Sequence, residues 1–228
     1  MSRNAWIIFA VICVAVLGGL VALSQKDKVD VSGVDHTKIQ AASANSGNIA
    51  DHVFGKTDSK VVLIEYGDFQ CPFCGDAYPQ VKDITDTYKD KITFIFRNYP
   101  LATMHPNAKA AAAAAEAAGL QGKYWEMHDK LYKSQSDWSS LSTDKRTDMF
   151  VTYAKEIGVK DLDKFKTDMA GNNVNKKINF DLALGNKVGI TGTPTFFLDG
   201  KKVSDSVSGS VINGDGSAMK QAIDDLLK

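Results

Sequence analysis

The chain has 228 residues, and its 27 basic and 27 acidic side chains give a formal net charge of zero at neutral pH. This balance argues against a strongly basic nucleic-acid-binding protein, so we expect no nucleic-acid partner. The sequence holds three cysteines and four scattered histidines (His36, His52, His105 and His128), which lack the number and spacing of a four-ligand zinc site, so we expect no metal.

The N-terminal segment, residues 1–24, contains an apolar run from Ala5 to Leu23 without a charged residue. As a helix this run spans about 28 Å, close to the hydrocarbon thickness of a bilayer. We therefore predict a transmembrane signal anchor. A cleaved signal peptide is the alternative, because Ala22-Leu23-Ser24 has the small-x-small pattern of a cleavage site. Cys13 is expected to be an apolar residue of the span rather than a lipidated one.

Residues 25–51 are rich in Ser, Asn, Asp, Lys and Gly, and they are predicted to form a flexible linker. The folded domain is expected over residues 52–228, with a possible edge strand near Ile49–Phe54. The apolar run of Val61–Tyr66 predicts a core strand that is buried on both faces. Glu65 lies near the end of this strand. It is either a carboxylate turned to solvent or a buried acid that accepts and relays a proton.

The motif CPFC, from Cys71 to Cys74, follows a short polar turn and opens a predicted helix that runs to about Asp90. At a helix start, free backbone N–H groups and the helix dipole stabilise a thiolate on the first cysteine. The thiolate is the form that attacks disulfides and leaves from them. Two buried cysteines without chemistry are the other interpretation. Pro79 is predicted to kink or break the helix.

A second core strand is predicted at Ile92–Phe96, and a long helical section follows it over about residues 103–188. Its first helix carries the alanine-rich run from Lys109 to Ala118. We predict four more helices, whose aromatic and methionine stripes are expected to form a core. His105 and His128 lie in this section, and they are expected to cap or pack rather than catalyse.

The last section begins with a turn, Gly189 to Pro194, that enters a strand at Thr195–Leu198. Asp199-Gly200 predicts a hairpin to Val203. An amphipathic helix over Met219–Leu227 closes the chain.

Three segments in this order resemble the DsbA-like thiol–disulfide oxidoreductases, including their membrane-anchored members. They are VVLIEYGDFQCPFC from Val61, YPLATMHPNAKAAAAAAEAAGLQGKYWEMHDKLY from Tyr99 and GITGTPTFFLDGKKV from Gly189. The resemblance covers roughly residues 52–228. It implies the α/β thioredoxin fold, with a helical domain inserted between the second core strand and the cis-Pro loop.

The resemblance also assigns catalytic roles. Cys71 would be the exposed nucleophile, Cys74 the buried resolving thiol and Glu65 the buried acid. The redox-active disulfide Cys71–Cys74 would do the chemistry without a bound cofactor.

The resemblance places substrate recognition at a cis peptide bond between Thr193 and Pro194, which faces the disulfide. A substrate strand could pair with the Thr193 backbone there. Pro72 and Phe73, between the two cysteines, are expected to contact the same substrate. Many relatives have histidine where this chain has Phe73, and phenylalanine adds no charge that would stabilise a thiolate.

The expected activity is the introduction of disulfide bonds into exported proteins, with unfolded or reduced exported proteins as substrates and a quinone-linked membrane oxidase for re-oxidation. We expect a monomer with a single pass through the cell membrane and an extracytoplasmic catalytic domain, or a secreted or periplasmic protein if the signal is cleaved. A disulfide reductase or isomerase on the same fold is the first alternative. A membrane-tethered peptide-binding or holdase module without redox activity is the second.

Overall fold

The computed structural model describes residues 3–26 and 29–228, which divide into two compact units, Met1–Asp30 and Val31–Lys228. The first unit contains helix α1 (Arg3–Lys26). A membrane crossing needs about 20 consecutive apolar residues. No helix within the described residues is both long enough and apolar enough for this, so the predicted transmembrane anchor is not supported. The side chains of the predicted cleavage site, Ala22 to Ser24, lie outside the described residues.

The second unit is built on a mixed sheet with the strand order β1-β3-β2-β4-β5. Its strands are β1 (Val53–Gly55), β2 (Val62–Gly67), β3 (Thr93–Asn98), β4 (Thr195–Leu198) and β5 (Lys201–Lys202). Strands β2 and β3 run parallel, and the other neighbouring strands pair antiparallel. Both predicted core strands and the N-terminal edge strand are confirmed.

The hairpin between β4 and β5 turns at Asp199 and Gly200, as predicted. Both residues have positive φ angles, 48° and 75°. Glycine and aspartate tolerate this left-handed conformation better than most residues, which explains why this dipeptide forms the turn.

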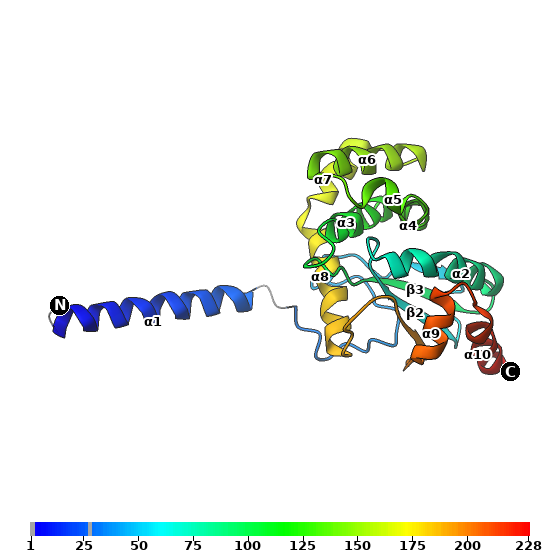
Figure 1. The fold of residues 1–228 in the computed structure, drawn as a ribbon, viewed down its shortest axis with the longest axis horizontal. Coiled ribbons are helices and arrows are strands. Elements are labelled where there is room, and N and C mark those ends of the chain that lie inside the picture. Colours follow the sequence, from blue (N-terminus) through cyan, green and yellow to red (C-terminus); the bar gives the residue numbers. More distant parts are fainter. Residues whose placement is uncertain (1–2, 27–28) are drawn as a thin grey trace. The chain divides into compact units, whose positions relative to one another are not determined.

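Helix α2 (Pro72–Tyr88) begins at the CPFC motif and packs against α9 (Asp205–Ile212), which in turn contacts α10 (Ser217–Leu227) (Figure 1). The helix continues through Pro79, so the predicted break is wrong. Tyr78 and Val81 are both buried, and this packing holds the helix together on either side of the proline. Helix α9 was not predicted, because its serine-rich sequence has little apolar periodicity.

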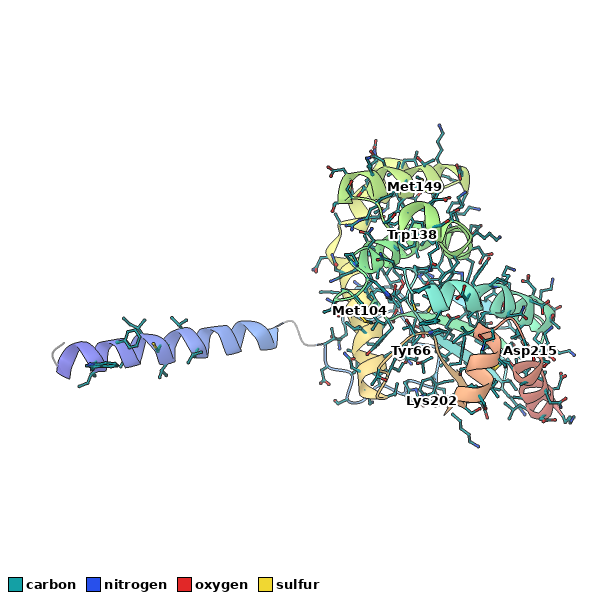
Figure 2. All side chains as sticks on the ribbon, in the orientation of Figure 1. Tyr66, Met104, Trp138, Met149, Lys202 and Asp215 are labelled. Carbon is teal, nitrogen blue, oxygen red and sulfur yellow. The ribbon has the colours of Figure 1, made fainter. Side chains whose placement is uncertain are left out.

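The predicted helical insertion is confirmed between β3 and β4 (Figure 1). It consists of α3 (Ala108–Gly119), α4 (Tyr124–Lys133), α5 (Gln135–Trp138), α6 (Thr143–Glu156), α7 (Leu162–Met169) and α8 (Asn172–Lys187). Helix α3 packs against α4, α7 and α8, and its small alanine side chains permit this close approach. The fully buried Trp138 anchors the short helix α5, which the sequence did not predict (Figure 2).

The described part of the predicted linker from residue 31 onward is not a free tether. Arg97 is fully buried on β3 and donates to the carbonyl oxygens of His36 and Lys38. It also pairs with Asp51 at 2.8 Å, and Lys177 of α8 pairs with the same carboxylate at 2.8 Å. These buried charges fix residues 31–51 to the sheet, so the domain begins at Val31 instead of His52. Residues 27–28 of the predicted linker lie outside the described residues.

Candidate active site

Cys71 is the N-cap residue of α2, and Pro72 occupies the first helical turn, where a missing N–H is tolerated. The turn that connects β2 to this helix is closed by a hydrogen bond from the Cys71 N–H to the Asp68 carbonyl at 3.0 Å. Cys71 and Cys74 are both free thiols in this structure. The motif therefore presents its first sulfur at the end of a strand and at the start of a helix, as the sequence predicted.

The Cys71 thiol is strongly acidified. Hydrogen bonds lower its pKa to about 6, although burial opposes this change. The largest contribution comes from the Cys74 side chain, and smaller ones come from the Thr193 side chain and from backbone N–H groups of the helix start. Its Sγ lies 3.4 Å from the Thr193 carbonyl oxygen. Only 3% of the Cys71 surface is exposed, which differs from the exposed nucleophile that the resemblance implied. The Thr193 carbonyl that lies against this sulfur belongs to the segment directly before β4.

Cys74 shows the opposite behaviour. It is 1% exposed, and burial is the main reason that its pKa is raised well above the ordinary value. The hydrogen bond with Cys71 and the charge of Glu65 raise the pKa further. The two thiols thus differ sharply in acidity, and only the first is a thiolate near neutral pH.

Glu65 lies in the interior and not towards solvent. Its register places it between Phe96 of β3 and Phe196 of β4, and it is 3% exposed. Burial, followed by the charge of Cys71, raises the pKa of its carboxyl to about 8. At neutral pH the carboxyl is therefore mostly protonated, which allows it to donate a proton as well as accept one.

The peptide bond between Thr193 and Pro194 is cis, as the resemblance implied, and both residues are buried directly before β4. Phe73 has a different environment: 59% of its surface is exposed beside the buried sulfurs.

Several residues that hold the active-site turn were not predicted. The Asp68 carboxylate is buried and accepts from the Gln70 and Leu101 N–H groups at 2.8 and 2.9 Å. It also bonds His105 at 2.7 Å, which agrees with the packing role expected of this histidine. Gln135 of α5 donates to the main chain of the same turn. No sequence pattern marks such side chains, because their partners lie far away along the chain.

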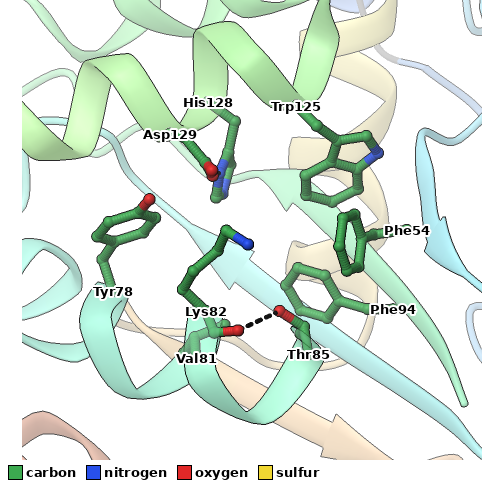
Figure 3. Close-up of a pocket in the computed structure, with 9 residues that line it drawn as sticks. All are labelled: Phe54, Tyr78, Val81, Lys82, Thr85, Phe94, Trp125, His128 and Asp129. Carbon is green, nitrogen blue, oxygen red and sulfur yellow. Dashed lines mark hydrogen bonds and ion pairs between the residues drawn. The ribbon is translucent and has the colours of Figure 1, made fainter. Parts of the chain in front are cut away.

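A small pocket lies between α2, α4 and the sheet. Figure 3 shows Tyr78, Lys82 and His128 around it, among apolar side chains. His128 is 3% exposed, bonds Asp129 at 3.1 Å, and has a pKa that burial lowers. None of the lining residues belongs to the CPFC motif, and His128 packs as predicted. Within the described residues, no group of three or more His, Cys, Asp or Glu side chains could hold a metal ion.

Comparison with known proteins places most of this chain in one family. A family model described as Thioredoxin matches residues 47–224. A Na(+)/H(+) antiporter NhaA 1 from Salinispora arenicola is 38% identical over 152 residues, which are 67% of this chain and 22% of the antiporter. The chain thus matches about a fifth of the length of that relative, and ion transport is the function named for that longer protein.

Solved structures show the same fold. BdbD from Bacillus subtilis has a TM-score of 0.66 and 22% identity, and the match covers 83% of this chain and 97% of BdbD. The thiol-disulfide oxidoreductase MdbA from Corynebacterium diphtheriae has a TM-score of 0.59 and 22% identity, with coverages of 78% and 94%. For alpha-DsbA1 from Wolbachia pipientis the TM-score is 0.61, the identity 23% and the coverages 78% and 90%. The chain therefore belongs to the thioredoxin family, and its fold is that of the DsbA-like proteins.

Proposed function

We propose that this protein is a thiol–disulfide oxidoreductase that introduces disulfide bonds into exported proteins. The observation that carries the proposal is the pairing of two thiols of unequal acidity, Cys71 at the start of α2 and Cys74 one turn further on. The names of the structural neighbours, among them a thiol-disulfide oxidoreductase, support the same activity.

The working form in this proposal is the Cys71–Cys74 disulfide. A substrate thiolate attacks the Cys71 sulfur, forms a mixed disulfide and expels Cys74. Because the pKa of Cys74 is raised, its sulfur needs a proton as it leaves, and the mostly protonated Glu65 can supply one. A second substrate thiolate then attacks the substrate sulfur of the mixed disulfide. It expels Cys71, which leaves readily as a low-pKa thiolate.

Substrate recognition would take place around the exposed Phe73 and the loop at Thr193. Main-chain groups of Thr193 and Pro194 would pair with an extended substrate segment, as strands do in β-augmentation. Pro72 and Phe73 would contact the apolar side chains of the same segment. This arrangement suits unfolded chains, which expose such segments.

Such a donor belongs in an oxidising, extracytoplasmic compartment, because cytosolic thiols are kept reduced. Each turnover leaves the donor as a dithiol, so a second protein must accept its two electrons. We propose a quinone-linked membrane oxidase for this step.

The activity is tested with a reduced dithiol peptide as the substrate. Cys71→Ser should abolish oxidation of the peptide, and a variant that still works at the wild-type rate would disprove the assignment. Cys74→Ser should accumulate mixed disulfides with the peptide through Cys71. If none accumulates under oxidising conditions, the roles of the two thiols are wrong.

A reductase on the same fold is the second candidate, and the uncharged Phe73 beside the thiols is the observation that favours it. The equilibrium reduction potential of the Cys71–Cys74 pair decides between the two. A value of about −120 mV, as in DsbA, fits a donor of disulfides, whereas a value of about −270 mV, as in thioredoxin, fits a reductase.

A further inference from the structure

One side chain of the helical insertion reaches the turn that carries Cys71. The Nε2 amide of Gln135 donates to the Phe69 carbonyl at 2.8 Å and to the Cys71 carbonyl at 2.9 Å. Gln135 begins the short helix α5, whose last residue is the fully buried Trp138. The Trp138 indole N–H donates to the Leu131 carbonyl at 2.9 Å. The amide of Gln135 is therefore held on an anchored element.

The Cys71 carbonyl is the acceptor that matters most for the chemistry. It belongs to the same residue as the reacting sulfur, and the negative end of its dipole disfavours a nearby thiolate. The Gly75 N–H donates to this oxygen at 3.1 Å, and Gln135 adds a second donor. Donor groups fixed in this way offset the negative charge of the oxygen without any rearrangement during the reaction.

We propose that Gln135 is a positioning residue for disulfide exchange, which fixes the turn before Cys71 and stabilises the thiolate through the carbonyl of that cysteine. The inference deepens the proposed function and rests on it. It gives the helical insertion a direct part in the chemistry of the thioredoxin core.

The residue after the CPFC motif makes this contact possible. A Cβ atom at Gly75 would lie 2.6 Å from Oε1 of Gln135, so the amide keeps its place only because position 75 has no side chain. Gly75→Ala should displace the flexible end of Gln135. It should not weaken α2 itself, because alanine is the better helix former. Two unrelated substitutions, Gln135→Leu and Gly75→Ala, therefore remove the same contact.

The test measures the acidity of Cys71 by the ultraviolet absorbance of its thiolate, and the redox equilibrium with glutathione. In each single variant we expect the acid dissociation constant of Cys71 to fall about threefold, the size of effect that follows from one lost hydrogen bond. The equilibrium constant for disulfide transfer at neutral pH should fall about twofold to threefold. Gln135→Leu with Gly75→Ala should show no larger effect than either change alone, because both act on one contact.

The matched control is Gln121, another glutamine of the insertion whose side chain forms hydrogen bonds with backbone groups. Its side chain donates to the Asp161 carbonyl at 2.8 Å and accepts from the Asp161 N–H at 3.0 Å. Gln121→Leu should lower thermal stability and leave the titration of Cys71 unchanged. If Gln135→Leu and Gly75→Ala also lower stability without moving that titration, Gln135 has only a structural role and the inference fails.

Failure of the proposed function has a different signature. A wild-type protein that does not exchange disulfides would overturn that function, while the titration of Cys71 in the variants would still decide the role of Gln135.

Discussion

Replacing Glu65 with glutamine tests whether the buried carboxyl is uncharged in the folded protein. In the folded protein its pKa is raised to about 8 by burial first and by the charge of Cys71 second, from an ordinary value of 4.5. The contribution of such a carboxyl to the free energy of unfolding is fully present below its pKa in the unfolded state, because it is then protonated in both states. This contribution is lost as the pH rises through its pKa in the folded state, since the carboxyl ionises more readily in the unfolded chain. The wild-type protein should therefore lose stability from about pH 4.5 to about pH 8, and Glu65→Gln should not.

The size of this loss follows from the two pKa values. One pKa unit corresponds to about 1.4 kcal/mol, so the full span is worth about 5 kcal/mol, and the part between about pH 5 and pH 8 is about 3 to 4 kcal/mol. The assay is urea unfolding of both reduced proteins at several pH values in this range. Subtracting the two free energies of unfolding removes most of the contribution of Cys71, which titrates in both proteins. The difference should move in favour of Glu65→Gln as the pH rises. A difference that is independent of pH would refute the raised pKa.

Three further predictions address the thiols and the buried charges. The thiolate absorbance of Cys71 should titrate with a midpoint near pH 6, whereas Cys74 should remain a thiol well above that pH. Below this midpoint, reduction of the disulfide takes up two protons, and the reduction potential should fall by about 59 mV per pH unit. Above the midpoint, reduction takes up one proton, and the potential should fall by about 30 mV per pH unit. A single slope across the range would contradict the assignment. Asp51→Asn leaves the buried charges of Arg97 and Lys177 without their shared partner, so urea unfolding should show a loss of about 3 to 5 kcal/mol; a loss below about 1 kcal/mol would show that the segment around Asp51 contributes little to the fold.

The parts of the fold that could be predicted are those with a local pattern. The apolar run of β2 and the helix after Cys71 are encoded by neighbouring residues, and so is the Asp199-Gly200 turn. The direction of Glu65 could not be predicted in the same way. A strand that is buried on both faces has no alternation of polar and apolar residues that would show which way a side chain points.

The error over residues 31–51 has another physical cause. The segment has the polar composition of a linker, but its order comes from buried charges on distant elements. Arg97 of β3 and Lys177 of α8 lie 46 and 126 residues away from their shared partner Asp51. Composition measures how much apolar surface a segment can bury, so it misses order that arises from buried ion pairs. The role of Gln135 could not be predicted from the sequence either, because its hydrogen-bond acceptors lie 66 and 64 residues away along the chain.

The acidities of the three buried groups together explain how this site can work near neutral pH. Cys71, Cys74 and Glu65 are all acids in an interior that tolerates little charge, and their pKa values are spread so that only Cys71 is ionised at pH 7. The reduced site then carries about one negative charge, which the helix start and Thr193 stabilise. In the proposed exchange, the substrate thiolate that attacks the Cys71–Cys74 disulfide loses its negative charge as it bonds to Cys71, and this charge would pass to the expelled sulfur of Cys74. A protonated Glu65 can neutralise Cys74, so the number of buried charges need not exceed one during the exchange. An ionised Glu65 would have no proton to give, and the site would then hold two negative charges, so the proposed exchange requires the raised pKa of Glu65.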